Sequence, residues 1–292
     1  MLLEARKLDK SFNGVYALKG LDLSLKEGEI HGLVGENGAG KSTFIKILGG
    51  VYTKNGGELS WNGAPFPADF GPVESRELGI NIIFQDHVLI PAFSALENIW
   101  LGRPYPRKGG LIQWKEMEKA ALKKATELGI CLDLKKSIFQ MTPAQKKCVE
   151  ILRAMMSDCK LMILDEPTAS LSDKEANLLF SIIKNLKANG TAVLYVTHRL
   201  EEIMALTDRV TVLRNGELVS TCDTGSTSQK ELVRLMSGNE KENGFAVNIL
   251  ASATANIHSG TPDSGCSCYK KDTDCGTQNA FSNQDRDQKR HL

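Results

Sequence analysis

The pattern of apolar and polar residues divides the chain near residue 240. Before that point, short β-type runs alternate with stretches of helical periodicity, and beyond it the periodicity disappears. The runs that predict strands are 2–8, 21–25, 30–34, 58–61, 80–84, 161–164, 192–196, 210–213 and 218–220. Those at 80–84, 161–164 and 192–196 are apolar almost throughout, as in strands buried on both faces of a parallel sheet.

Helix signals lie between these runs, and residues 88–157 are mostly helical in pattern. Capping boxes, in which a serine precedes a glutamate by three positions, predict helix starts at Ser94, Ser172 and Ser228. Asn215-Gly216 predicts a β-hairpin. Strands that alternate with helices predict an α/β fold with a mainly parallel sheet and helices on both faces.

Composition narrows the class of protein. The chain has 36 Lys and Arg against 35 Asp and Glu, so no bulk positive charge favours nucleic acid as a partner. We expect no membrane-spanning segment and no secretory signal, because no run approaches about 18 apolar residues. Seven cysteines form no CxxC pair. We expect buried thiols of a cytoplasmic protein at Cys131, Cys148, Cys159 and Cys222.

A glycine-rich motif lies between the predicted strand 30–34 and a predicted helix at 43–48. It reads Gly35, Glu36, Asn37, Gly38, Ala39, Gly40, Lys41, Ser42, Thr43. The pattern GxxxxGK[ST] lets backbone N–H groups turn inward around phosphates, while Lys41 adds a positive charge and Ser42 can ligate Mg²⁺. This phosphate loop (residues 35–43) predicts that the chain binds a nucleoside triphosphate.

Polar residues follow three other predicted strands. Asp165 and Glu166 come directly after 161–164, and we expect Asp165 to hold Mg²⁺ and Glu166 to polarise water as a general base. His198 and Gln85 end two further strands, which point toward the same ligand face, where the amide of Gln85 can contact Mg²⁺ or the attacking water. A contact between His198 and the γ-phosphate is what the family resemblance described below implies. The alternatives are an acidic turn for the carboxylates and a packed or surface position for His198. Gln85 taken alone would be interpreted as a residue without a functional role, but beside Asp165, Glu166 and His198, which also lie at strand ends, we expect it to belong to the site.

The order of these motifs resembles the nucleotide-binding cassettes of ABC transporters over about residues 2–240. Finer matches resemble the simple-sugar importer branch, which handles ribose, galactose and sugar-like autoinducer-2; they are 35–43, 96–99, 101–103 and 149–152. In that branch two cassettes normally lie in tandem, and this sequence resembles the first. The resemblance implies a RecA-like P-loop NTPase core, an N-terminal antiparallel β portion and an inserted helical subdomain at about 88–157.

The resemblance also implies roles and partners. Phe12 would stack on adenine, with Val15 nearby, although a core aromatic is the alternative for Phe12. Residues 170–173 match a loop that communicates across a cassette dimer. The expected partners are membrane permease subunits, a second cassette and, indirectly, a solute-binding protein, with the chain peripheral at the cytoplasmic face of the cell membrane. The solute itself depends on those other subunits.

The signature (residues 141–145) departs from the family pattern LSGGQ. It reads Met141, Thr142, Pro143, Ala144, Gln145. In the family, this element closes over the γ-phosphate bound by the partner cassette, a role implied here for Thr142, Ala144 and Gln145. Thr142 keeps a hydroxyl that can cap a helix, whereas Pro143 carries no N–H and Ala144 adds a methyl. We expect a weakened signature, with homodimeric and mixed pairing both open.

From about residue 241 to 292 the chain is rich in Ser, Thr, Asn, Gly and Asp, which predicts disorder. His258, Cys266, Cys268 and Cys275 fit no standard zinc spacing. Our hypothesis is that a frameshift or truncation has replaced a second cassette here.

Three functions follow from the sequence. The first is the ATP-hydrolysing subunit of a sugar-type ABC importer. The second is a soluble cassette ATPase of DNA repair or translation, which the low net charge of +1 disfavours. The third is an ATP-binding remnant that no longer cycles.

Overall fold

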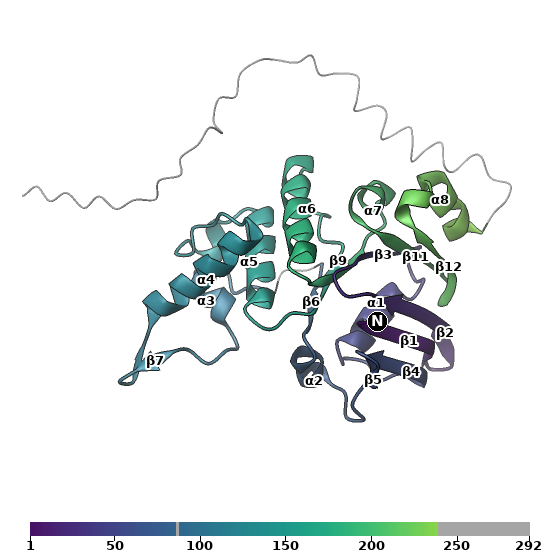
Figure 1. The fold of residues 1–292 in the computed structure, drawn as a ribbon, viewed down its shortest axis with the longest axis horizontal. Coiled ribbons are helices and arrows are strands. Elements are labelled where there is room, and N and C mark those ends of the chain that lie inside the picture. The colour runs from purple at the N-terminus through teal and green to yellow at the C-terminus, as the bar shows by residue number, and fades with distance from the viewer. Residues whose placement is uncertain (86–87, 239–292) are drawn as a thin grey trace, which may run out of the picture. The chain divides into compact units, whose positions relative to one another are not determined.

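The computed structural model describes residues 1–85 and 88–238, all of which fall within one compact unit, Met1–Asn243 (Figure 1). An antiparallel sheet in the order β2-β1-β4-β5 opens the chain. Its strands are β1 (Leu3–Phe12), β2 (Val15–Leu25), β4 (Gly56–Trp61) and β5 (Ala64–Pro65). The β1–β2 turn is Asn13-Gly14, with left-handed φ angles of 48° and 84°, the geometry that an Asn-Gly hairpin turn adopts.

A six-stranded sheet in the order β12-β11-β3-β10-β9-β6 forms the centre. Its strands are β3 (Ile30–Gly35), β6 (Ile80–Ile83), β9 (Leu161–Asp165), β10 (Ala192–Val196), β11 (Arg209–Arg214) and β12 (Glu217–Asp223). All neighbouring pairs are parallel except β11–β12, which is joined by the predicted Asn215-Gly216 hairpin. Parallel pairing brings the carboxyl ends of β3, β6, β9 and β10 to one edge of the sheet.

Alternate residues of the central strands pack into two different hydrophobic cores. Leu161 and Ile163 belong to the core shared with the antiparallel sheet and α1 (Lys41–Leu48), whereas Met162 and Leu164 belong to the core shared with the helices of the opposite face. This confirms strands buried on both faces. The helices of that opposite face include α6 (Asp173–Ala188) and α7 (Leu200–Leu206), and α8 (Gln229–Ser237) packs against β11.

The stretch predicted to be mostly helical contains three helices that contact one another. They are α3 (Ala95–Trp100), α4 (Trp114–Leu128) and α5 (Pro143–Met155), with the 3₁₀ turn η1 (Ile138–Gln140) and the small hairpin β7 (Arg107–Lys108) and β8 (Leu111–Ile112) between them. The capping boxes at Ser94 and Ser172 are formed as predicted. A further helix, α2 (Pro72–Glu77), precedes β6.

Two expectations require correction. The first two strands run to Phe12 and from Val15, well beyond 2–8 and 21–25, because their outer halves lie on an exposed sheet face where polar residues are tolerated. Cys131 is exposed, because it follows the end of α4 in a surface loop. Cys222, which lies in β12, is only half-buried. Cys148 and Cys159 are buried, and burial raises the pKa of each thiol to about 12.

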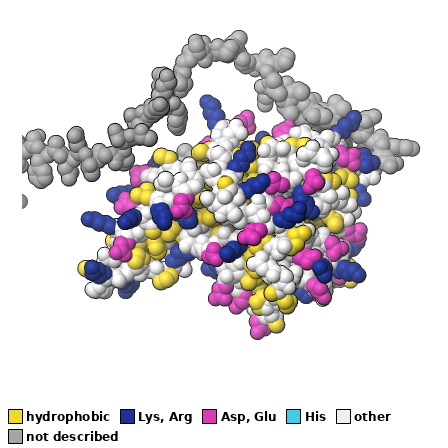
Figure 2. Space-filling view, in the orientation of Figure 1, with side chains coloured by type: hydrophobic (Ala, Val, Ile, Leu, Met, Phe, Trp, Pro, Cys, Tyr) yellow, Lys and Arg dark blue, Asp and Glu magenta, His cyan; other side chains and the backbone are white. Residues whose placement is uncertain are grey.

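Basic and acidic side chains are intermixed on the face shown in Figure 2. None of the helices in residues 1–85 and 88–238 has the length and apolar character needed to cross a bilayer. Residues 239–292, where the tail and its cysteines were predicted, lie outside the described residues.

Candidate functional site

The phosphate loop joins the carboxyl end of β3 to the start of α1. Gly38 and Gly40 have left-handed φ angles of 85° and 104°, which favour glycine. A side chain at Gly40 would also meet the carbonyl oxygen of Ala17 at 2.6 Å. Gly40 is the N-cap of α1, and no side chain caps this helix. The first turn of α1 therefore keeps its N–H groups for an anion.

Lys41 is the buried cation of the loop, with 8% of the residue exposed. Its Nζ donates to the carbonyl oxygens of Gly35, at 2.7 Å, and Glu36, at 3.0 Å. Burial lowers the pKa of Lys41, and the carboxylates of Glu166 and Asp165 oppose that shift. A polyphosphate in the loop would stabilise this half-desolvated ammonium.

Asp165 and Glu166 follow one another at the carboxyl end of β9. Burial raises the pKa of Asp165, and the charge of Glu166 raises it further, whereas Lys41 and Lys46 oppose the rise. Glu166 has a left-handed φ of 46°, an unfavourable conformation for a residue with a side chain. Its N–H donates to the carbonyl oxygen of Val196 at 2.8 Å, and this bond to β10 holds the carboxylate at the edge of the sheet.

His198, just beyond β10, contacts Glu166 directly. The distance from its Nδ1 to Oε1 of Glu166 is 3.0 Å. The two side chains are 61% and 20% exposed, so water reaches the pair. A carboxylate that accepts from one ring nitrogen fixes the orientation of the imidazole. The structure thus joins two of the predicted site residues into an oriented acid–base pair.

Oxygen donors that suit Mg²⁺ come from three elements. Ser42 is exposed in the first turn of α1, Asp165 ends β9, and Gln85 is exposed just beyond β6. Hydroxyl, carboxylate and amide oxygens are hard donors, and a divalent cation would relieve the repulsion between Asp165 and Glu166. In the described part of the chain, no cluster of three or more His, Cys, Asp or Glu side chains suits a metal. The residues therefore fit a Mg²⁺ that keeps several water or phosphate ligands.

Phe12 and Val15 face each other across the end of the β1–β2 hairpin. Phe12 is 41% exposed and Val15 is 73% exposed, which excludes the core alternative for Phe12. The Phe12 ring lies edge-on to Tyr52, with centroids 5.1 Å apart, and Nζ of Lys10 is 4.9 Å from the Phe12 centroid. Tyr52 follows α1, so the pair of Phe12 and Tyr52 connects the hairpin to the helix that begins in the phosphate loop. The position of Tyr52 in the sequence gives no signal that predicts this contact.

The signature forms the start of α5 and is satisfied from within. Thr142 is the N-cap, and its hydroxyl accepts from the N–H of Gln145 at 3.3 Å while Oε1 of Gln145 accepts from the N–H of Thr142 at 3.1 Å. Pro143 occupies the first turn and Ala144 is buried. No hydrogen bond or ion pair links residues 141–145 to the phosphate loop within the described ranges.

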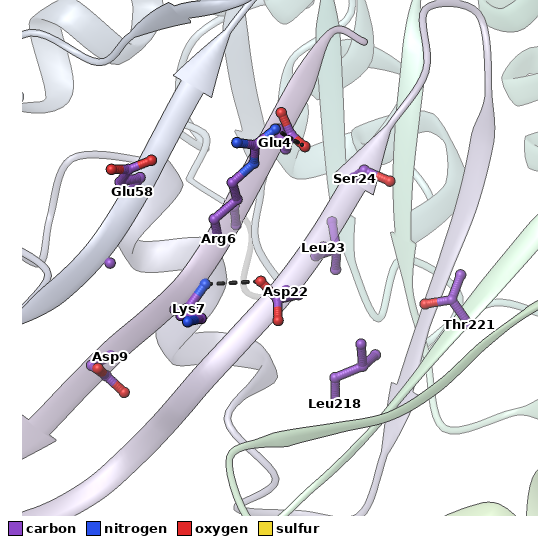
Figure 3. Close-up of a pocket in the computed structure, with 12 residues that line it drawn as sticks. Glu4, Arg6, Lys7, Asp9, Asp22, Leu23, Ser24, Glu58, Leu218 and Thr221 are labelled. Carbon is purple, nitrogen blue, oxygen red and sulfur yellow. Dashed lines mark hydrogen bonds and ion pairs between the residues drawn. The ribbon is translucent and has the colours of Figure 1, made fainter.

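A polar hollow of about 810 Å³ lies elsewhere, on the antiparallel sheet beside β12 (Figure 3). None of its lining residues is a predicted site residue. Among its acidic side chains, Glu4 pairs with Arg6 at 3.0 Å, and Asp22 accepts from the backbone N–H of Lys7 at 2.9 Å. We therefore place the functional site at the edge of the central sheet and not in this hollow.

Comparisons with known proteins identify the family of the chain. A family model described as "ABC transporter" matches residues 18–169. The chain is 44% identical over 234 residues to a ribose import ATP-binding protein of Rubrobacter xylanophilus, and 42% identical over 237 residues to one of Escherichia coli O157:H7. These matches cover 80% and 81% of this chain but 45% and 46% of the relatives, so the chain spans about half of their length.

Solved structures show the same fold. A nucleotide-free ATP-binding cassette from an ABC transporter matches with a TM-score of 0.69 and 25% identity, covering 82% of this chain and 96% of that chain. A dimeric bacterial ABC transporter cassette matches with a TM-score of 0.65 and 26% identity, covering 76% and 99%. The ordered motifs, the mixed sheet with its antiparallel neighbour, and these matches show that the chain belongs to the ABC transporter family.

Proposed function

We propose that this chain binds and hydrolyses ATP as a subunit of an ABC importer for a simple sugar or a sugar-like solute. The observation that carries the proposal is the hydrogen-bonded pair of Glu166 and His198, which lies beside Asp165. The buried Lys41 interacts electrostatically with the carboxylates of both Glu166 and Asp165. The relatives named as ribose import ATP-binding proteins support the solute class.

Each side chain has a role in this proposal. The N–H groups of 35–43 and the ammonium of Lys41 bind the β- and γ-phosphates. Ser42, Asp165 and Gln85 would hold Mg²⁺, which would neutralise charge on those phosphates. Glu166 accepts a proton from the attacking water. His198, oriented by Glu166, contacts the γ-phosphate, and Phe12 stacks on adenine beside Val15.

The signature would act on a second nucleotide site. We propose that Thr142, Ala144 and Gln145 contact the γ-phosphate held by a second cassette, either another copy or a different chain, and the dimeric cassette among the structural matches supports such pairing. Binding of ATP would close the pair and hydrolysis would reopen it. Pro143 supports a second candidate, an ATP-binding remnant that closes too weakly to cycle.

The remaining organisation follows from the family. We propose a cassette at 1–240 in which 88–157 is the helical subdomain that contacts permease subunits at the cytoplasmic face of a membrane. A cleft of about 530 Å³, lined by the segment Ile80–Ile83 together with Val88, Arg103 and Arg153, supports this, because it lies where the two parts of the cassette meet. The solute-binding protein would act indirectly.

The test is phosphate release from ATP by the purified chain with and without Mg²⁺, followed by uptake of labelled ribose when the chain is co-expressed with ribose permease subunits. We expect Mg²⁺-dependent release that the Glu166→Gln variant lacks. Tight ATP binding without release, even with the permease present, would favour the remnant. Phosphate release without ribose uptake would support the ATPase activity and exclude ribose as the transported solute.

A further inference from the structure

Glu202 on α7 is a buried carboxylate, 4% exposed, at the side of the proposed site. Its two oxygens lie within hydrogen-bond distance of four side chains: Thr168 Oγ1 at 2.7 Å, Tyr195 Oη at 2.8 Å, Arg199 Nη1 at 3.0 Å and Thr197 Oγ1 at 3.1 Å. The three hydroxyl-bearing residues are themselves almost fully buried. A buried charge is tolerated when donors surround it in this way.

The four donors belong to the two segments that carry the acid–base pair. Thr168 lies two residues beyond Glu166, and Thr197 and Arg199 flank His198. The Thr197 hydroxyl also accepts from the N–H of Arg199 at 3.0 Å, so the chain turns tightly around His198. One carboxylate is thus bonded to both segments whose side chains meet at 3.0 Å.

This arrangement makes the two segments dependent on each other. If the segment after β9 moved relative to the segment after β10, a hydrogen bond to a buried charge would break, and such bonds are roughly twice as strong as neutral ones. Burial and the charge of Glu202 both raise the pKa of Tyr195, so its hydroxyl remains a donor across the physiological range.

We propose that Glu202 is a positioning residue that holds Glu166 and His198 in contact for ATP hydrolysis. The proposal rests on the proposed function, because it concerns the same water-activating pair. Glu202 reaches nucleotide only through these partners, so its loss should change kcat rather than nucleotide affinity.

A matched control exists at the opposite edge of the same sheet. Glu29, which precedes β3, is 5% exposed and is bonded by the N–H of Lys26 at 2.7 Å, by His31 at 2.9 Å and by Arg209 at 3.3 Å. Replacing it removes a comparably buried and partnered carboxylate far along β3 from the phosphate loop. A general loss of stability would therefore affect Glu29→Ala and Glu202→Ala alike.

The first readout is the split between kcat and KM. We expect Glu202→Ala to lower kcat at least tenfold with KM for ATP within about threefold. Glu202→Gln should recover part of the loss, because its amide oxygen can still accept from Thr168 and Arg199, while its NH₂ group can donate to hydroxyls that reverse their hydrogen bonds. Glu29→Ala should keep kcat within about twofold. Equal losses in the two alanine variants would overturn the proposal. If Glu202→Ala does not fold, Thr168→Val, which removes one donor, should lower kcat in the same direction, and an unchanged kcat there would overturn it.

The second readout needs no hydrolysis. The imidazole NMR signals of His198, assigned with His198→Ala, should shift when Glu166 is replaced by Gln, because the two side chains are in contact. In the Glu202→Ala background that response should disappear, whereas in the Glu29→Ala background it should persist. A full response without Glu202 would refute the positioning role even if the wild type hydrolyses ATP. Loss of this response in the Glu202→Ala background would support the positioning role even if the wild-type chain does not hydrolyse ATP. An inactive wild type would refute only the proposed function.

Discussion

The helix starts of α1 and α5 are both expected to meet phosphate, yet they are built in opposite ways. At α1, the N-cap is Gly40, no side chain caps the helix, and Lys41 lies in the loop. At α5, Thr142 and Gln145 exchange hydrogen bonds, and Pro143 brings no N–H. The backbone N–H groups at the start of α1 remain available for a ligand, whereas at the start of α5 the N–H groups of Thr142 and Gln145 are already bonded to side chains of the same helix start.

This difference teaches which half of a nucleotide site the chain can supply by itself. A free helix start binds an anion without first breaking internal bonds. A capped helix start is already satisfied by its own side chains. To contact phosphate, α5 must therefore break a capping hydrogen bond or donate the hydroxyl proton of Thr142, which the cap does not use. We therefore expect tight ATP binding at α1 and a weak contribution from α5.

The largest expected effect is the loss of ATP hydrolysis when the carboxylate of Glu166 is replaced. Glu166→Gln should lower single-turnover ATP hydrolysis by about 10²–10⁴-fold, the usual contribution of a general base, while ATP affinity stays close to that of the wild type. The matched control is Glu201→Gln, an exposed position on α7, which should leave the rate unchanged. A rate in Glu166→Gln within threefold of the wild type would remove Glu166 from the chemistry.

The next effect concerns the cation in the loop. Lys41→Ala should weaken ATP binding by about 10–100-fold, because a charged hydrogen bond contributes about 1.5–3 kcal/mol. Lys54→Ala is the control, since Lys54 also donates to a backbone carbonyl, that of Gly57 in β4 at 2.7 Å, but is exposed. Titration with a fluorescent ATP analogue measures both, and equal affinities in the two variants would contradict the assignment.

Pro143→Ala sharpens the comparison from the signature side. Restoring one N–H at the start of α5 should tighten ATP-dependent pairing of the chain by about 5–30-fold, which corresponds to about 1–2 kcal/mol, and should not change ATP affinity. Pro72→Ala makes the same change at the start of α2. Sedimentation with ATP compares them, and a gain in both variants or in neither would show that the missing N–H has no role.

The smallest effect isolates the cap itself. Thr142→Ala should lower the free energy of unfolding of the nucleotide-free chain by about 1 kcal/mol, whereas Thr142→Ser should retain most of it, because serine keeps the capping hydroxyl. Chemical denaturation followed by circular dichroism measures the difference. Equal losses in both variants would mean that the hydroxyl does not stabilise α5.

The sequence predicts well the parts of the site that lie close together in the chain. The loop 35–43 and the pair Asp165 and Glu166 are contiguous motifs at strand ends, and parallel pairing alone brings their strands together. Glu202 and Tyr52 carry no such signal, because they meet Thr168 and Phe12 only through tertiary packing. The β1–β2 hairpin did have a local signal, the Asn-Gly pair at 13–14, which the polar residues around it obscure.

The most direct test of the account is the mass of the Glu166→Gln variant in solution, measured by light scattering with Mg²⁺ and with or without ATP. Removing the general base should trap any closed pair. The account predicts a monomer without nucleotide and a weak dimer that forms only with ATP, with each phosphate loop meeting the signature of the other copy. A variant that is saturated with ATP yet monomeric at every concentration would contradict pairing between copies of this chain, and the second cassette would then have to be a different chain.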